Sequence, residues 1–418
     1  MANNVIRFFE HERWSVEERF LDYFDSLAAF NERHAHRFFD VGNRTVKFKS
    51  YVGVIQVGGL TIEILPKLDR ITDDKSKMHR NLIAMLHRIG MFPPEDAGSA
   101  SLSGIGGNMF EFYLNLFLRE VQRIVRFGLP KQYSPLQGNE RFMHGHLLMR
   151  QHLTRNIFDR SRFYVEFQSF SKNHLMNQIL KQALRIIAGM PVKAALDAHN
   201  LLTFFETVDD RQIHPCDFRH LKYTRNNECC RTAVGMAELI ISNHQPDLRH
   251  GNMSITSLLF DMNRLFERYV AHDILRHAKD KEIKISLQRQ HLFWRSDGSG
   301  AGRTVRPDIV ISKNGKTFIL DTKWKLPERN EHSDADLRQI YTYSIQWNTD
   351  RVILIYPAPG PDFESFDGSF SASNGIHDRR PASIWKVPIL TEDSLNKDLG
   401  RDILERLFPE SVLPRHSF

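Results

Sequence analysis

Two aspartates and a lysine flank a hairpin-like segment of the chain, and their spacing brings them to one place. Asp308 opens one apolar stretch, Asp321 and Lys323 close the next, and Asn314-Gly315 lies between the two stretches. Asn-Gly is a strong signal for a two-residue hairpin turn. Each aspartate lies six residues from the turn, so the two should face each other across an antiparallel pair. Asp321 and Lys323 share one face because side chains alternate along a strand.

This set of side chains is suited to phosphodiester hydrolysis. Carboxylates among apolar neighbours are costly unless they are paired or bind a metal ion. Two close carboxylates attract a hard divalent cation, here Mg²⁺ with Mn²⁺ as an alternative. Such a cation polarises a phosphoryl oxygen and acidifies a bound water, while a lysine can orient that water. The alternative is an ordinary hairpin with surface charges.

Further candidate residues lie on the helices expected on either side of the hairpin. Glu267, on the preceding helix, is a candidate metal ligand and catalytic carboxylate. Gln339 and Tyr343 project from one face of the following helix because they are four residues apart, and they are candidate supporting residues. Basic residues that suit phosphate contacts also flank the site: Arg303, Arg306, Lys313, Lys316 and Lys325.

The elements that must position these residues follow an α/β order. Apolar periodicity predicts, in sequence, a helix at 254–279, strands at 282–288, 305–312 and 316–324, a helix at 334–347 and a strand at 351–357. This order favours a mixed sheet flanked by helices. The C-terminal segment 251–418 is therefore predicted to be the domain that carries the site.

The rest of the chain divides into a β-rich segment, 1–75, and a mainly helical segment, 76–250. In the first, we expect a helix at 16–30 and a β meander at 45–67, with a turn at Gly58-Gly59 and an end at Pro66. In the second, we expect helices at 77–90, 108–127 and 173–189, a loop at 93–107 and a boundary near 245–255.

Composition excludes several classes of protein. The three cysteines among 418 residues are too few for a disulfide framework or a four-cysteine zinc site, which favours a cytoplasmic protein. No apolar run reaches 18 residues, so we expect no membrane contact. The net charge of +7 permits a polyanionic partner. The chain also lacks a P-loop, because Val310 occupies the first glycine position before Gly315-Lys316-Thr317.

These residues resemble those of a known nuclease superfamily. Pro307-Asp308 and Asp321-Thr322-Lys323 resemble the PD-(D/E)XK signature, and Gln339-x-x-x-Tyr343 resembles the extra motif of its RecB-like branch. Two blocks, 51–69 and 258–270, resemble the McrC family, the nuclease subunit of McrBC modification-dependent restriction systems, and weaker blocks lie at 142–152 and 173–184. The similarity runs from about 45 to 357; Thr322 stands where the family often has alanine, and His146 where it usually has arginine.

The resemblance implies a Mg²⁺-dependent endonuclease that cuts double-stranded DNA in an anti-phage restriction system, with a restriction-endonuclease-like C-terminal domain. Asp308, Asp321, Glu267 and the Thr322 carbonyl would bind the metal, and Lys323 would assist the nucleophile. The resemblance also implies an McrB-like AAA+ GTPase hexamer as partner. The N-terminal part of the chain would dock in the central pore of that hexamer and stimulate its GTPase. A homodimer through the nuclease domain is a further expectation.

Two other functions stay open at this point. The chain could be a stand-alone PD-(D/E)XK nuclease in DNA repair or RNA processing, which would cleave without a GTPase. It could also be a non-catalytic activator of an AAA+ motor. The complete set of Asp308, Asp321 and Lys323 argues against the second alternative.

Overall fold

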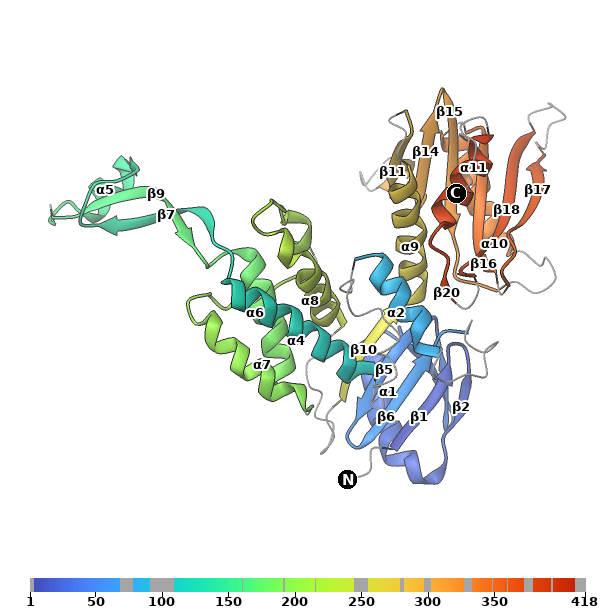
Figure 1. Ribbon diagram of the computed structural model, residues 1–418, viewed down its shortest axis with the longest axis horizontal. Coiled ribbons are helices and arrows are strands. Elements are labelled where there is room, and N and C mark those ends of the chain that lie inside the picture. The colour runs from blue at the N-terminus through green and yellow to red at the C-terminus, as the bar shows by residue number, and fades with distance from the viewer. Residues whose placement is uncertain are drawn as a thin grey trace, which may run out of the picture. The chain divides into compact units, whose positions relative to one another are not determined.

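The chain folds into two compact units in the computed structural model (Figure 1). The first unit comprises residues 1–103, 248–255 and 259–418, and the second comprises 104–247 and 256–258. The structure describes residues 4–67, 78–90, 109–159, 161–190, 192–214, 216–243, 255–278, 282–296, 302–326, 333–347, 349–358, 360–371, 379–391 and 394–409. The predicted division into 1–75, 76–250 and 251–418 stays a prediction.

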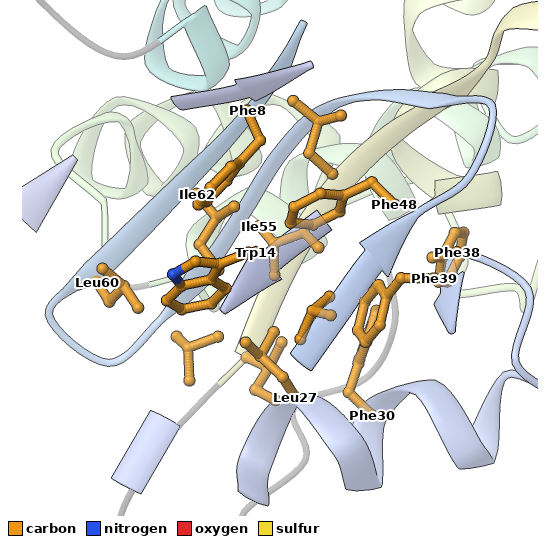
Figure 2. Packing of buried hydrophobic residues seen from close by; sticks show 14 of the residues in the cluster. Phe8, Trp14, Leu27, Phe30, Phe38, Phe39, Phe48, Ile55, Leu60 and Ile62 are labelled. Carbon is orange, nitrogen blue, oxygen red and sulfur yellow. The ribbon is translucent and has the colours of Figure 1, made fainter. Parts of the chain in front are cut away.

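Two small sheets and one helix form the N-terminal part of the first unit. One sheet has the order β1-β6-β5-β10 and the other the order β2-β4-β3. Their strands are β1 (Asn4–Phe9), β2 (Arg13–Ser15), β3 (Phe39–Gly42), β4 (Thr45–Phe48), β5 (Tyr51–Val57), β6 (Leu60–Leu65) and β10 (Ile255–Asp261). Aromatic side chains from both sheets, among them Phe8, Trp14 and Phe48, pack together with Phe30 of α1 (Leu21–Arg33) (Figure 2). This shared aromatic core holds the two sheets together.

Most predicted N-terminal elements are present. Helix α1 confirms the helix expected at 16–30, and β5 pairs with β6 around the predicted turn at Gly58-Gly59. Strand β6 ends at Leu65, one residue before Pro66. The single meander at 45–67 is wrong, however, because β4 pairs with β2 and β3 in the other sheet.

The predicted helix at 254–279 is wrong in its first part. Residues Ile255–Asp261 form strand β10, and helix α9 spans Met262–His277. The side chain of Asp261 caps α9 by accepting from the backbone N–H groups of Asn263 and Arg264. The short apolar run before Asp261 fits a buried strand or a buried helix equally well by periodicity.

A six-stranded mixed sheet forms the C-terminal part of the first unit, in the order β11-β14-β15-β16-β18-β17 (Figure 1). The strands are β11 (Lys284–Leu287), β14 (Ile309–Lys313), β15 (Lys316–Thr322), β16 (Arg351–Ala358), β17 (Glu364–Phe370) and β18 (Arg380–Pro388). Strand β16 runs parallel to β15 and β18, and the other pairs are antiparallel. Helix α10 (Asp334–Trp347) packs on β16, and α9 packs on α11 (Leu399–Leu407). The predicted mixed α/β class is confirmed.

The connections around this sheet include two short antiparallel pairs. Strands β12 (His291–Arg295) and β13 (Gly302–Val305) form one, and β19 (Leu390–Thr391) and β20 (Ser394–Leu395) form the other. The strand predicted at 305–312 is therefore two strands, with Arg306-Pro307-Asp308 between β13 and β14.

In its described part, the second unit contains a group of helices and a ribbon of strands that extends away from them (Figure 1). The helices are α4 (Met109–Phe127), α6 (Leu175–Ala188), α7 (Ala194–Leu202) and α8 (Arg231–Asn243). The ribbon has the order β7-β9-β8 and carries helix α5; its elements are β7 (Gln132–Glu140), β8 (His146–Leu147), α5 (Met149–Arg155) and β9 (Phe163–Ser171). Short 3-10 turns lie at Glu18–Phe20, Thr203–Phe205, Asp217–His220 and Glu228–Cys230.

Helices α4 and α6 confirm the predictions at 108–127 and 173–189, and α2 (Met78–Arg88), in the first unit, confirms that at 77–90. The sequence did not predict β7, because both faces of this strand are largely exposed and it lacks alternating apolar residues. The loop predicted at 93–107 lies outside the described residues, as does most of the boundary near 245–255.

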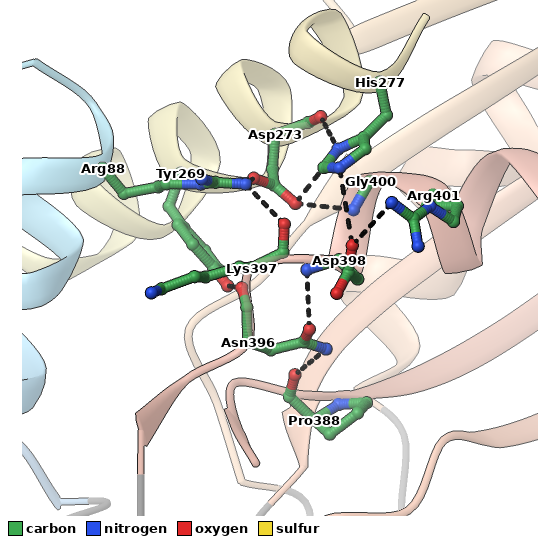
Figure 3. Close-up of polar contacts among 10 residues, drawn as sticks. All are labelled: Arg88, Tyr269, Asp273, His277, Pro388, Asn396, Lys397, Asp398, Gly400 and Arg401. Atoms are coloured by element: carbon green, nitrogen blue, oxygen red, sulfur yellow. Dashed lines mark hydrogen bonds and ion pairs between the residues drawn. The ribbon is translucent and has the colours of Figure 1, made fainter. Parts of the chain in front are cut away.

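A buried carboxylate on α9 organises the contact between three helices of the first unit (Figure 3). Asp273 is fully buried and pairs with Arg88 of α2 through the arginine Nε at 2.6 Å. The backbone N–H of Gly400, on α11, donates to Asp273 Oδ2 at 2.7 Å. A Cβ at position 400 would lie 2.1 Å from the backbone oxygen of Asp273, so glycine is required for this close approach.

We expect Gly400→Ala to lower the free energy of unfolding by about 1–3 kcal/mol, the usual cost of overpacking a core. The matched control is Gly59→Ala, because a Cβ at Gly59 meets no atom within 4 Å. Thermal or chemical unfolding of the two variants measures the difference. Equal stability of both variants would show that α11 does not pack on α9 at this distance.

Candidate active site

The hairpin predicted from Asn314-Gly315 is confirmed. Both residues have positive φ, 51° and 77°, as a type I′ turn requires. Strands β14 and β15 pair from Lys313↔Lys316 to Ile309↔Leu320. Asp308 directly precedes Ile309 and Asp321 directly follows Leu320, so the register puts the two aspartates at the same end of the hairpin.

Asp308 is held by the last residue of β15. Its Oδ2 accepts from the Thr322 backbone N–H at 2.7 Å and from the Thr322 hydroxyl at 2.8 Å. The amide Nε2 of Gln288 donates to Asp308 Oδ1 at 3.1 Å. The carboxylate is therefore oriented by two segments that approach it from different sides.

Gln288 also joins Glu267 to this arrangement. Its Nε2 donates to Glu267 Oε1, and its backbone N–H donates to the carbonyl of Asp308 at 2.9 Å. Its φ is 52°, a conformation that non-glycine residues seldom adopt. Sequence reasoning missed Gln288, because a glutamine at the end of a short strand is part of no motif. The structure thus links Glu267 to Asp308 through an amide.

Asp321 and Lys323 form a largely buried ion pair. Lys323 Nζ lies 2.7 Å from Asp321 Oδ2, and Asp321 is 1% exposed. Burial and the charge of Asp308 raise the pKa of Asp321, while the Lys323 ammonium opposes that rise. Burial acts to lower the pKa of Lys323, but the carboxylate of Asp321 raises it above its ordinary value. Lys323 therefore stays charged beside Asp321.

Glu267 is the most perturbed carboxyl of the group. Burial, together with the charge of Asp308, raises the pKa of Glu267 from 4.5 to about 7, against the lowering effect of the Gln288 hydrogen bond. Strongly shifted carboxyl groups of this kind gather at functional sites.

Gln339 and Tyr343 line the neighbouring helix surface, as their spacing predicts. Gln339 Nε2 donates to the Tyr343 hydroxyl at 2.7 Å, and this hydroxyl donates to the backbone carbonyl of Arg306 at 3.1 Å. Burial and the charge of Asp321 raise the pKa of Tyr343. The pair thus holds the segment that leads into Asp308.

Trp324, the residue after Lys323, anchors this end of β15 to the N-terminal sheets. Its Nε1 donates to Glu10 Oε1 at 2.7 Å, and its carbonyl accepts from Lys67 Nζ at 3.0 Å. Its ring is buried and contacts Phe266 of α9. The indole therefore fixes the backbone next to the Asp321–Lys323 pair.

The donor set fits a hard divalent cation. Asp308 and Asp321 offer carboxylate oxygens, which Mg²⁺ prefers. Asp321 Oδ2 is buried and, within the described part of the chain, accepts no hydrogen bond of ordinary geometry despite its ion pair with Lys323. Among the described residues, no three His, Cys, Asp or Glu side chains form a ready-made metal cluster. The roles given to Asp308, Asp321, Glu267, Thr322 and Lys323 stay predictions.

Three of the five flanking basic residues are not placed to meet phosphate. Lys313 is buried with its Nζ over the ring of Phe408. Lys325 pairs with Asp336 at 2.7 Å. Lys316 lies at the turn, at the far end of the hairpin from the aspartates. Arg303 and Arg306 are the two on the approach to Asp308. Sequence spacing could not show where the Lys313 and Lys325 side chains point, because it does not tell which distant residues a long side chain meets.

The comparisons with known proteins identify the family. A family model described as McrBC 5-methylcytosine restriction system component matches residues 46–357, more than half of the chain. The chain belongs to this McrBC family. No curated protein matches it.

Solved structures similar to this McrBC-family chain include two assemblies from Thermococcus gammatolerans. One is a refined half-complex from a tetradecameric assembly of McrB AAA+ hexamers with bound McrC. A chain of this half-complex is 18% identical to this chain, with a TM-score of 0.58. The match covers 97% of this chain and 100% of that one. A chain of the McrBC complex solved by cryo-EM is 20% identical, with a TM-score of 0.46, and covers 67% of this chain and 90% of that one. The first likeness shows a shared fold.

The McrBC-family chain has, among its described helices, none that is long and apolar enough to cross a membrane.

The raised pKa of Glu267 predicts a pH-dependent effect of its removal. A carboxyl whose pKa is higher in the folded than in the unfolded chain lowers the free energy of unfolding of the protein as pH rises from 4.5 to about 7. Glu267→Gln should therefore be more stable than the wild type above pH 7, by about 1–2 kcal/mol after allowance for solvent screening, and this gain should vanish below pH 4.5.

Chemical unfolding in EDTA at several pH values measures this difference. Glu32→Gln, at an exposed position of α1, is the control. A gain for Glu267→Gln that does not change with pH would contradict the prediction.

Proposed function

We propose that this chain is the McrC-type subunit of an McrBC-like anti-phage restriction system, a Mg²⁺-dependent endonuclease that cuts double-stranded DNA through a PD-(D/E)XK site. The observation that carries the proposal is the meeting of Asp308, Asp321 and Lys323 at one end of the β14–β15 hairpin. Membership of the McrBC family supports it.

Each side chain has a role in this mechanism. Asp308 and Asp321 hold the metal, with the Thr322 carbonyl, and Glu267 supports Asp308 through the Gln288 amide. A Mg²⁺ ion held there would polarise a phosphoryl oxygen and lower the pKa of a bound water. Lys323 carries a positive charge beside Asp321, where it can orient the attacking water and offset charge that develops on the phosphate.

A partner supplies what this chain lacks. The sequence contains no P-loop, so the proposed McrB-like AAA+ GTPase hexamer would provide both the motor and the recognition of modified DNA. The ribbon of the second unit supports a docking role because its end exposes large apolar side chains, and such patches mark protein contacts. These side chains are Phe142, Met143, Met149, Leu153, Ile157 and Phe158. Dimerisation through the nuclease domain belongs to the same proposal.

Asp308→Asn, Asp321→Asn and Lys323→Ala should each reduce DNA cleavage by about 1000-fold or more, because loss of several kcal/mol of transition-state stabilisation costs tenfold for each 1.36 kcal/mol. The assay follows cleavage of a modified plasmid with partner, GTP and Mg²⁺. All three variants should stimulate the partner's GTPase as the wild type does.

Matched controls come from the same elements. Lys316→Ala changes an exposed lysine at the turn of the hairpin, and Asp334→Asn an exposed aspartate of α10. Both should cleave as the wild type does. Near-normal cleavage by Asp321→Asn would refute the site, and efficient cleavage by the wild type without partner and GTP would favour a stand-alone nuclease.

The apolar ribbon end predicts a second separation of function. Phe158 is 97% exposed, and Phe158→Ser should weaken GTPase stimulation about 10-fold or more, since a central aromatic anchor often contributes about 2 kcal/mol or more to an interface. Leu196→Ser on α7, at a position 70% exposed, is the control. Titration of the partner's GTPase with each variant measures the effect. Equal stimulation by both variants would exclude the ribbon end as the docking surface.

A further inference from the structure

A cleft of about 490 Å³ lies beside the proposed active site, between the β12–β13 pair and helix α10. Its wall includes Phe293 of β12, Thr304 of β13, and Gln339, Thr342 and Tyr343 of α10. The catalytic roles described above use none of this space.

The cleft adjoins the segment that leads into Asp308. Tyr343 lines it and donates a hydrogen bond to the carbonyl of Arg306, whose side chain also lines it. Arg306 precedes Asp308 by two residues. A DNA strand whose phosphate lay at Asp308 and Asp321 would therefore pass the mouth of the cleft with an adjacent nucleotide.

The wall combines a flat aromatic surface with hydrogen-bonding groups. Phe293 lies at an irregularity in the β12–β13 pair, where the register shifts between Leu292 and Trp294, and its side chain lines the cleft. The Thr304 hydroxyl and the Gln339 amide can each donate and accept hydrogen bonds, and the Thr342 hydroxyl, which donates to the Arg338 carbonyl at 2.9 Å, can accept one. A nucleobase has a flat face that stacks on aromatic rings and edges that make hydrogen bonds.

Arg306 lines the cleft, and further arginines lie on or beside the two strands of its wall. Four exposed arginines lie between positions 289 and 306, and none forms an ion pair with another residue in the described part of the chain; they are Arg289, Arg295, Arg303 and Arg306. Arginine side chains in such positions contact phosphates and fix the register of a nucleic acid. The charge thus favours a polyanionic strand over a neutral ligand.

We propose that this cleft binds the base of one nucleotide next to the scissile phosphate, unpaired from its complement and stacked on Phe293, with the arginines on the flanking phosphates. The inference rests on the proposed nuclease function and extends it to how the DNA strand is positioned. Phe293 is then a positioning residue, and the enzyme cuts most readily where one nucleotide can leave the duplex.

Two neighbouring aromatic residues provide a matched test. Phe293 is 52% exposed and lines the cleft, whereas Trp294 is 53% exposed on the same strand and does not. In the full complex with GTP and Mg²⁺, Phe293→Ala should lower kcat/KM for duplex DNA about 10-fold, since it removes the ring on which one base stacks. Phe293→Tyr should restore cleavage, and Trp294→Ala should cleave as the wild type does.

Duplexes with a single abasic site, moved one position at a time across the cleavage site, identify the bound nucleotide. One position should lower wild-type cleavage about 10-fold by loss of the stacked base. The same abasic site should cause no further loss in Phe293→Ala. Equal losses for Phe293→Ala and Trp294→Ala, or an added loss in Phe293→Ala at every abasic position, would overturn the inference.

The same experiments distinguish a failure of the cleft from a failure of the proposed nuclease function. If Asp308→Asn abolishes cleavage while Phe293→Ala cleaves normally, the proposed function stands and the nucleotide cleft is wrong. If the wild-type complex does not cleave DNA at all, the proposed function fails first and the cleft with it.

Discussion

The pairing of β14 with β15 is the constraint on which the candidate site depends. The pair stops at Ile309↔Leu320, so the Thr322 N–H lies beyond Ile309, the first residue of β14. This N–H donates instead to the carboxylate of Asp308, which takes the place of a backbone carbonyl of the neighbouring strand. A change of register by one residue would move Asp308 away from Asp321 and would turn the side chains of β15 to the other face.

Bringing three carboxyl groups together has an electrostatic cost, and the surrounding residues offset part of it. Lys323 pairs with Asp321, and the Gln288 amide joins Glu267 to Asp308. Burial, together with the remaining repulsion from Asp308, raises the pKa of Glu267 and that of Asp321, because both disfavour the ionised form. A site with this excess of negative charge favours a cation over further protein contacts.

The N-terminal sheets and the six-stranded sheet support each other within the first unit. Trp324 connects them directly after Lys323, through Glu10 and Lys67. Asp273 likewise connects three helices: its carboxylate pairs with Arg88 of α2 and accepts a hydrogen bond from the backbone N–H of Gly400 on α11. In the second unit, Tyr164 and Val165 of β9 are buried, while the end of the ribbon exposes large apolar side chains such as Phe142 and Phe158.

The sequence by itself determined the hairpin and the position of the two aspartates at its end. Asn314-Gly315 fixed the turn, two apolar strands fixed the pairing, and the spacing of Asp308 and Asp321 followed, because all three are local properties of the chain. The α/β class and the McrBC family could also be predicted from local patterns and motif blocks. The polar strand β7 could not, since its sequence carries no apolar alternation.

Only the tertiary structure decided what surrounds the hairpin. It showed that 255–261 is a strand, since a buried apolar run has no period that separates strand from helix. It brought Gln288 between Glu267 and Asp308, and it turned Lys313 and Lys325 away from the site. These contacts join residues distant in sequence or depend on the direction of a side chain, and neither is encoded in local spacing.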